Sequence, residues 1–116
     1  MSESELKRTV EDYLTILQSQ GKLFFLRLNS GDFIEVRGET RRRIKGCPKG
    51  TADLMVITNN GRFDAPNKFY PVVYFLELKT PKGKVSLEQV EFGKMVEIHG
   101  CIYLVIRKLE ELQGYI

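Results

Sequence analysis

A chain of 116 residues is long enough for one hydrophobic core, and we predict a single domain over residues 1–116. Its hydrophobic content of 42% excludes a disordered chain, and no apolar run is long enough to cross a bilayer. The net charge of +3 is a mild bias toward anionic partners. The polar start "MSESELKR" is unlike a secretory signal, so we expect a cytoplasmic protein, whether cellular or phage-encoded and acting in its host.

The first predicted elements are a helix and a strand. Leu6, Val10, Leu14 and Leu17 recur at helical spacing, and Gly21 follows as a stop signal. The segment "KLFFLRL" then has the composition of a strand, and the turn-prone "NSGD" follows it.

A basic segment comes next. "FIEV" and "RRRI" flank Gly38 and predict a short hairpin, in which Glu39 is the acid that opposes a run of cations. Such a run is typical of an arm that contacts phosphates, and a solvated, charged hairpin is the alternative. The cations are Arg37, Arg41, Arg42, Arg43, Lys45 and Lys49.

The second half of the chain predicts a core of strands around one helix. "ADLMVI" and "PVVYFLELK" are apolar strands joined by the loop "TNNGRFDAPNKFY". "SLEQVEFGKMVEIHG" predicts a helix that ends at Gly100, "CIYLVI" a last strand, and "LEELQ" a helical turn. The order αβ(ββ)ββαβ(α) predicts a mixed sheet flanked by helices, in the α/β class and bordering on α+β.

Two charged residues end an apolar strand. Since side chains alternate along a strand, Glu77 and Lys79 share a face with Val73 and Phe75. One loop joins this strand to "LMVI", so antiparallel pairing is expected, which places Asp53 near Glu77 and Lys79. A surface salt bridge is one explanation of the cluster. Charges this close to core strands are costly, however, unless they are paired or bind a metal.

The donor atoms of the cluster favour Mg²⁺ or Mn²⁺, because these ions prefer carboxylate oxygens. A zinc site would need His or Cys ligands, and the single histidine, His99, lies at a predicted helix end. The sequence also has no G-x-x-x-x-G-K-[ST] loop and no G-x-S-x-G turn, so neither a P-loop nor a nucleophile elbow is expected.

The same residues carry a resemblance to a known family. "KGTADLMVI" and "FLELKTPKGKVSLEQ" follow the pattern G-x-x-D, an apolar strand, E-x-K, a Gly-containing turn and a Gln-bearing helix. The chain resembles the VRR-NUC (virus-type replication-repair nuclease) family of the PD-(D/E)XK superfamily over nearly its whole length. The resemblance implies a restriction-endonuclease-like fold and metal-dependent nuclease activity. Ala52 replaces a proline that relatives often have before the aspartate, which leaves the chemistry of the aspartate intact.

The resemblance also implies roles for individual residues. Asp53 and Glu77 would bind Mg²⁺ or Mn²⁺ together with the backbone carbonyl of Leu78. Lys79 would orient or activate the attacking water and stabilise charge on the phosphate. Gln89 would support the site, close a capping box with the serine three residues before it, or do both.

Members of the superfamily usually add a glutamate from the first helix, and helical phase selects among three. At about 100° per residue, Glu3 falls inside the apolar stripe of the helix. Glu5 falls on the opposite face, at capping-box spacing from Ser2, and Glu11 lies well off the stripe. We therefore expect Glu3 to be the additional metal ligand.

These residues together predict an endonuclease that hydrolyses DNA by structure more than by sequence, in replication, repair or recombination. The basic segment runs directly into Asp53, and with Lys82 and Lys84 it is expected to hold the DNA backbone. A nucleic-acid-binding module of the same fold that does not cleave is the first alternative, and an RNA-directed nuclease is the second.

We also expect a homodimer that acts on branched or Holliday-junction DNA, because a four-way junction needs two opposed cuts and a twofold dimer supplies two sites. Relatives of this kind tend to pair. A monomer with internal aromatic residues is the alternative. The aromatic residues available for an interface are Phe69, Tyr70, Tyr74, Phe92 and Tyr115.

Overall fold

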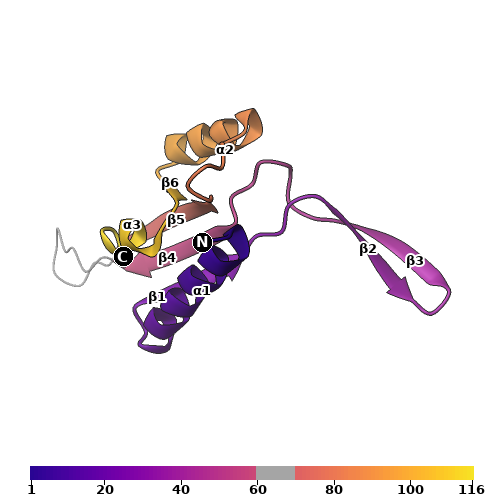
Figure 1. Ribbon diagram of the computed structural model, residues 1–116, viewed down its shortest axis with the longest axis horizontal. Coiled ribbons are helices and arrows are strands. Elements are labelled where there is room, and N and C mark those ends of the chain that lie inside the picture. Colours follow the sequence, from indigo (N-terminus) through magenta and orange to yellow (C-terminus); the bar gives the residue numbers. More distant parts are fainter. Residues whose placement is uncertain (60–69) are drawn as a thin grey trace.

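The computed structural model describes residues 1–59 and 70–116, which form a mixed α/β fold (Figure 1). The predicted order of elements is confirmed, whereas most of the predicted loop "TNNGRFDAPNKFY" lies outside the described residues. The elements are α1 (Glu3–Ser19), β1 (Leu23–Arg27), β2 (Asp32–Arg37), β3 (Thr40–Lys45), β4 (Leu54–Asn59), β5 (Pro71–Leu78), α2 (Leu87–Ile98), β6 (Ile102–Ile106) and α3 (Leu109–Gln113).

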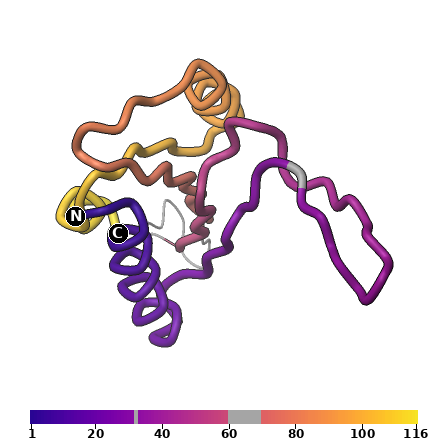
Figure 2. Tube along the Cα trace, turned by 45° about the vertical axis from the view of Figure 1, so that its right-hand side comes forward, coloured from indigo at the N-terminus to yellow at the C-terminus, as the bar shows by residue number. Residues whose placement is uncertain are grey.

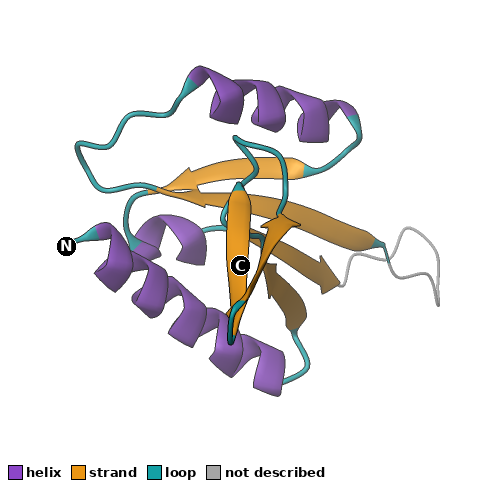
Figure 3. Ribbon diagram, turned by 90° about the vertical axis from the view of Figure 1, so that its right-hand side faces the viewer, coloured by secondary structure: helices purple, strands orange, loops and turns teal. Residues whose placement is uncertain are grey.

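The main sheet has the strand order β1-β4-β5-β6. β4 pairs antiparallel with both β1 and β5, as predicted for β4 and β5, while β6 runs parallel to β5. A parallel neighbour requires a crossover, and α2 supplies it between β5 and β6. Figure 3 shows the resulting layers, with α2 on one face of the sheet and α1 and α3 on the other.

The core lies between the sheet and the α1–α3 layer. The apolar stripe of α1 buries Leu6, Val10 and Leu14 completely, against strand residues such as Leu54 and Leu76. Each such side chain contributes roughly 1.5–3 kcal/mol by leaving water. The stripe predicted from the sequence therefore orients α1 on the sheet. None of the described helices is long and apolar enough to cross a membrane.

The α2 layer packs through aromatic rings. Phe92 of α2 makes edge contacts with Phe75 and Tyr103, with ring centroids 5.3 and 6.1 Å apart. Gly93 lies directly beneath the Tyr103 ring, where a Cβ atom would come within 2.7 Å of Tyr103 Cδ2. The close approach that this glycine allows sets the distance between α2 and the sheet.

The predicted basic hairpin is confirmed as a separate two-stranded sheet. β2 and β3 pair antiparallel around a turn in which Gly38 has a positive φ of 57°. Figure 2 shows the hairpin projecting from the body of the molecule, and the whole chain extends 58 × 32 × 30 Å. All described side chains of β3 are exposed. We call this unit, residues 32–45, the ribbon.

Candidate active site

The register of β4 and β5 brings the two predicted metal ligands to one end of the sheet. Leu54 pairs with Leu76, so Asp53 lies opposite Glu77. The Asp53 backbone N–H donates to the Leu76 carbonyl at 3.0 Å, and the Leu78 N–H donates to Asp53 Oδ2 at 2.7 Å. Backbone hydrogen bonds therefore fix both the position and the rotamer of the aspartate.

Glu77 is the one charged residue that is buried among those the structure describes, with 3% of its surface exposed. Its Oε1 atom accepts a hydrogen bond from Gln89 Nε2 and lies 3.8 Å from Lys79 Nζ. Its Oε2 atom is buried without a hydrogen-bond partner in residues 1–59 and 70–116. A buried oxygen that lacks a partner carries a desolvation cost, which a bound cation would remove.

The electrostatics of Asp53 and Glu77 also favour a bound cation. Burial and the neighbouring Asp53 carboxylate raise the pKa of Glu77 from 4.5 to about 7. Lys79 acts in the opposite direction, and the charge of Glu3 adds a further increase. The Glu77 carboxyl therefore titrates near neutrality, and a cation at this position would favour its ionised form.

Gln89 closes the capping box and also forms a hydrogen bond with Glu77. Its Oε1 atom accepts from the Ser86 N–H at 2.8 Å and its backbone N–H donates to Ser86 Oγ at 3.2 Å, which completes a capping box at the start of α2. Because Oε1 is occupied in this way, the amide nitrogen faces Glu77. The helix cap thus holds the orientation of a site residue.

The turn after β5 positions the lysines. Lys79 has a side chain that is 17% exposed, and its backbone N–H donates to the Ile106 carbonyl at 3.0 Å. Arg107 Nη1 donates to the carbonyls of Thr80 and Gly83, each at 2.7 Å, and so holds the turn closed. Lys82 and Lys84 in this turn are exposed, and their side chains reach solvent on the same end of the sheet.

Arg107 and Tyr103 are two neighbours of the site that sequence reasoning missed. The Tyr103 hydroxyl is buried without a partner among the described residues, and burial followed by the charges of Glu77 and Asp53 raises the pKa of Tyr103 to about 12. Neither residue belongs to a recognisable motif. Side chains alternate along a strand, and this alternation places Tyr103 on the same face of the sheet as Phe75. It could have predicted the position of Tyr103 but not its proximity to the site.

The three glutamates of α1 differ in their surroundings as helical phase predicted. Glu3 lines a cavity of about 220 Å³ together with Asp53 and Leu78, at the end of the sheet. Glu5 closes the capping box with Ser2, with both hydrogen bonds at 3.1 Å. Glu11 forms an ion pair with Arg27. Glu3 is thus the α1 glutamate that borders the candidate site.

The residues present fit a hard divalent cation that keeps much of its water. No three His, Cys, Asp or Glu side chains form a metal-binding group within residues 1–59 and 70–116. What converges is a carboxylate pair, Asp53 and Glu77, beside a cavity to which Leu78 contributes. Mg²⁺ is commonly bound by one or two carboxylates with the remaining positions held by water and substrate oxygens, so the pair suits Mg²⁺ or Mn²⁺.

The predicted phosphate-contacting residues lie in three places, one of which is the turn with Lys82 and Lys84 described above. Arg41, Arg42, Arg43 and Lys45 are exposed on β3 of the ribbon, away from the carboxylates. Lys49 lies between the ribbon and the site and forms an ion pair with Glu88 at 3.6 Å.

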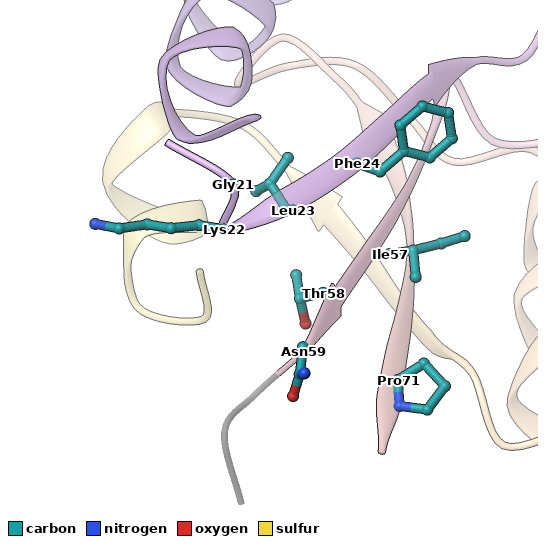
Figure 4. A pocket seen from close by; sticks show the side chains of 8 residues that line it. All are labelled: Gly21, Lys22, Leu23, Phe24, Ile57, Thr58, Asn59 and Pro71. Carbon is teal, nitrogen blue, oxygen red and sulfur yellow. The ribbon is translucent and has the colours of Figure 1, made fainter. Parts of the chain in front are cut away.

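A larger cavity, of about 370 Å³, lies at the opposite end of the sheet (Figure 4). It is lined by residues of β1, β4 and β5, including Leu23, Phe24, Ile57 and Pro71, and Figure 4 shows Lys22 extending away from them. It contains no carboxylate among its described lining residues, so the candidate site remains the carboxylate end of the sheet.

No protein-family model matches the sequence, and no curated protein or solved structure is significantly similar to the chain.

The pKa of Glu77 predicts how the stability of the metal-free protein depends on pH. Since the folded state retains a proton between about pH 4.5 and about pH 7 that the unfolded state has lost, the free energy of unfolding falls as pH rises through this window. The total loss is about 3 kcal/mol, and Glu77→Gln should abolish it. Urea unfolding in EDTA at pH 5 and pH 8 measures the effect.

The exposed Glu97→Gln variant is the matched control and should keep the pH dependence of the wild type. Parallel stability curves for the wild type and Glu77→Gln would contradict the assignment.

Proposed function

We propose that this protein is a nuclease that depends on Mg²⁺ or Mn²⁺ and hydrolyses phosphodiester bonds in DNA, as its resemblance to VRR-NUC proteins implies. The observation that supports the proposal most directly is the pairing of Asp53 with the buried Glu77, whose Oε2 has no partner among the described residues, next to Lys79. We further propose that it acts in the cytoplasm, on DNA intermediates of replication, repair or recombination.

The carboxylates and one backbone group would hold the ion. Asp53, Glu77 and the carbonyl of Leu78 are the proposed ligands, and Glu3 would act from the edge of the adjoining cavity. The ion, when bound, lowers the pKa of a coordinated water and neutralises charge that develops on the phosphoryl oxygens.

The remaining residues prepare the site for this chemistry. Lys79 places an ammonium 3.8 Å from Glu77 Oε1, where it can orient the attacking water and stabilise the negative phosphate in the transition state. Gln89 holds the Glu77 carboxylate through a hydrogen bond, so the ligand is oriented before the substrate arrives.

A binding module without catalysis is the second candidate, but the burial of Glu77 weighs against it. A surface that binds phosphates gains affinity from cations and loses it from nearby carboxylates. Keeping an acid that is 3% exposed, with one oxygen lacking a hydrogen bond from the described residues, also costs stability. Both costs are offset if the carboxylate binds a cation. An RNA-directed nuclease would use the same residues and is distinguished by substrate.

The first prediction tests the proposed ligands. Asp53→Asn and Glu77→Gln should lower the rate of Mg²⁺-dependent cleavage at least about 100-fold, because each removes a charged ligand while keeping the shape of the side chain. Lys79→Ala should lower the rate similarly but keep metal binding. Gel assays of DNA cleavage, with calorimetry of Mn²⁺ binding, measure both properties.

Glu97→Gln is again the control, since this exposed residue of α2 should leave cleavage unchanged. Wild-type rates in purified, folded Asp53→Asn or Glu77→Gln would exclude the mechanism.

The second prediction separates the glutamates of α1. Glu3→Gln should slow cleavage because Glu3 borders the cavity beside Asp53. Glu5→Gln should leave cleavage unchanged and lower stability by less than about 1 kcal/mol, because it removes a negative charge from the first turn of the helix but a glutamine can still close the capping box. Cleavage rates and thermal melts of the two variants are compared. A larger loss of rate in Glu5→Gln than in Glu3→Gln would show that another face of α1 serves the site.

We also propose that the protein acts as a homodimer on branched DNA, including four-way junctions. Of the aromatic residues considered for an interface, Tyr70 and Tyr115 are 45% and 58% exposed, while Tyr74 belongs to the core. Phe92 packs between α2 and the sheet, and Phe69 lies outside the described residues. Of these five residues, the two exposed tyrosines are thus the ones that could contribute to an interface.

The third prediction concerns this assembly. Light scattering at micromolar concentration should give twice the mass of one chain, and the protein should cut a four-way junction faster than a linear duplex when Mg²⁺ is present. Flap and splayed-arm substrates, and an RNA duplex of the same sequence, complete the panel. A monomer that leaves junctions intact would exclude the dimeric resolvase, and faster cleavage of RNA would favour the RNA-directed alternative.

A further inference from the structure

The outer face of α2 is apolar, although the helix already packs on the sheet through its other face. Four of its apolar side chains are between 39% and 78% exposed, namely Leu87, Val90, Met95 and Ile98. Figure 3 shows α2 as the outermost element on its side of the sheet. The longer helix α1 differs, because Ile16 is its one exposed large apolar side chain. A helix that is apolar on both faces is expected to be covered on both.

A narrow stripe runs along the middle of this outer face. At about 100° per residue, four exposed side chains fall within about 60° of the helix circumference. Two are apolar and lie at the ends of the helix, Leu87 and Ile98, and two are charged and lie near its middle, Glu91 and Lys94. Neither charge is used in an ion pair within residues 1–59 and 70–116. We call these four residues the α2 stripe.

The α2 stripe is symmetric about the midpoint of the helix. Leu87 and Ile98 are the first and last residues of α2, and Glu91 and Lys94 lie at equal distances from its centre. Turning the helix end for end therefore exchanges leucine with isoleucine and glutamate with lysine. Two antiparallel copies of α2 related by a twofold axis would place an apolar residue beside an apolar residue and an acid beside a base, each contact occurring twice.

The charges select the antiparallel orientation. In a parallel pair of helices, Glu91 would face the same residue of the other copy, and so would Lys94, and like charges in close proximity oppose association. Glu88 and Glu97 lie on opposite margins of the outer face, and the twofold axis keeps them on opposite sides of the interface. Glu88 also forms an ion pair with Lys49 of its own chain.

The chemistry of the α2 stripe favours a second copy of the chain over other occupants. A polyanion is attracted by an excess of cations, whereas the stripe has one acid for its one base. A helix that lies on a membrane surface usually has a polar face rich in Lys and Arg, and α2 contains the single cation Lys94. A surface whose apolar and charged groups match their own inverted order is complementary to itself.

This pairing also determines where the two candidate sites lie. α2 begins beside the site, since Gln89 in its first turn donates a hydrogen bond to Glu77. A helix of 12 residues is about 18 Å long, and antiparallel helices begin at opposite ends of the pair. Each copy would therefore hold its carboxylates at its own end of the helix pair, which suits two opposed cuts.

We propose that two copies of this protein associate through the outer faces of α2, antiparallel about a twofold axis, with Leu87 against the partner's Ile98 and Glu91 against the partner's Lys94. The inference rests on the proposed homodimer and assigns its interface. It does not depend on nuclease activity.

The first test exchanges the charges of the α2 stripe. Glu91→Lys and Lys94→Glu each place like charges opposite one another in a homodimer, so each should raise the dissociation constant about 10-fold or more. Mixed in equal amounts, the two variants should form a heterodimer with nearly the affinity of the wild type, because every acid then meets a base. Charges that acted only within their own helix would not respond to mixing.

Sedimentation velocity between about 1 and 100 µM measures the dissociation constants, and a fluorescent label on one variant identifies the heterodimer. Circular dichroism checks that each variant is folded.

The second test removes the apolar ends of the stripe. Leu87→Gln with Ile98→Gln should weaken the dimer at least about 100-fold while the helix is retained, because glutamine is a good helix former. Ile16→Gln is the matched control, since Ile16 of α1 is 57% exposed and lies outside the stripe. Tyr70→Ser with Tyr115→Ser tests the exposed tyrosines as a competing interface. Both of these variants should remain dimeric.

A dimer that persists in the Leu87 and Ile98 variant, dissociates in the tyrosine variant alone, or shows no recovery when the charge variants are mixed would overturn the α2 interface and leave the homodimer standing. A wild type that is monomeric at 100 µM would refute both the interface and the homodimer, at about the highest concentration of the assay. A dimer that depends on the α2 stripe but cleaves no DNA in Mg²⁺ or Mn²⁺ would refute the nuclease alone.

Discussion

The placement of a carboxylate inside the sheet is the constraint around which the rest of this protein is arranged. Glu77 sits between residues of a buried strand and is 3% exposed, where an acid without compensation is costly. Its neighbour Asp53 increases that cost, and the two together raise the Glu77 pKa to about 7. Lys79 and Gln89 compensate one oxygen, and the other retains its acceptor capacity. The fold thus maintains a local destabilisation at one end of the sheet, which is the usual relation between stability and a functional site.

Elements that are distant in the sequence hold Glu77 and its neighbours in place. The cap of α2 orients Gln89, and the aromatic contacts of Phe92 hold α2 on the sheet. Arg107 follows β6 and donates hydrogen bonds to two carbonyls of the turn that contains the lysines, which holds this turn closed. The backbone N–H of Arg107 in turn donates to Glu111 at 2.6 Å. Substitutions in α2 or α3 would therefore alter the site through its supports, without touching a ligand.

The sequence predicted those parts of the fold and site that depend on local pattern. The apolar stripe of α1 placed Glu3 at the sheet end, and a single loop between two strands was enough to place Asp53 opposite Glu77. Arg107 and Tyr103 could not be predicted in this way, because their relation to the site arises from the parallel pairing of β5 and β6 across a crossover helix. The ion pair between Glu35 and Arg42 also depends on the register of the ribbon, and the run "RRRIK" alone does not reveal it.

The ribbon and the carboxylates are coupled because one short, constrained segment joins them. Were residues 46–53 a flexible linker, the arginines would raise the local concentration of DNA near the site but would not select which phosphate reaches it. Backbone hydrogen bonds at Asn29, Gly31 and Asp53, together with the tight packing of Gly50, instead fix the direction of the ribbon. In the proposed nuclease, a duplex held on the ribbon would be presented at one orientation to Asp53 and Glu77. The proposed selectivity for DNA structure would follow from this rigidity, since a substrate whose arms diverge at another angle could not contact the ribbon and the carboxylate end of the sheet at the same time.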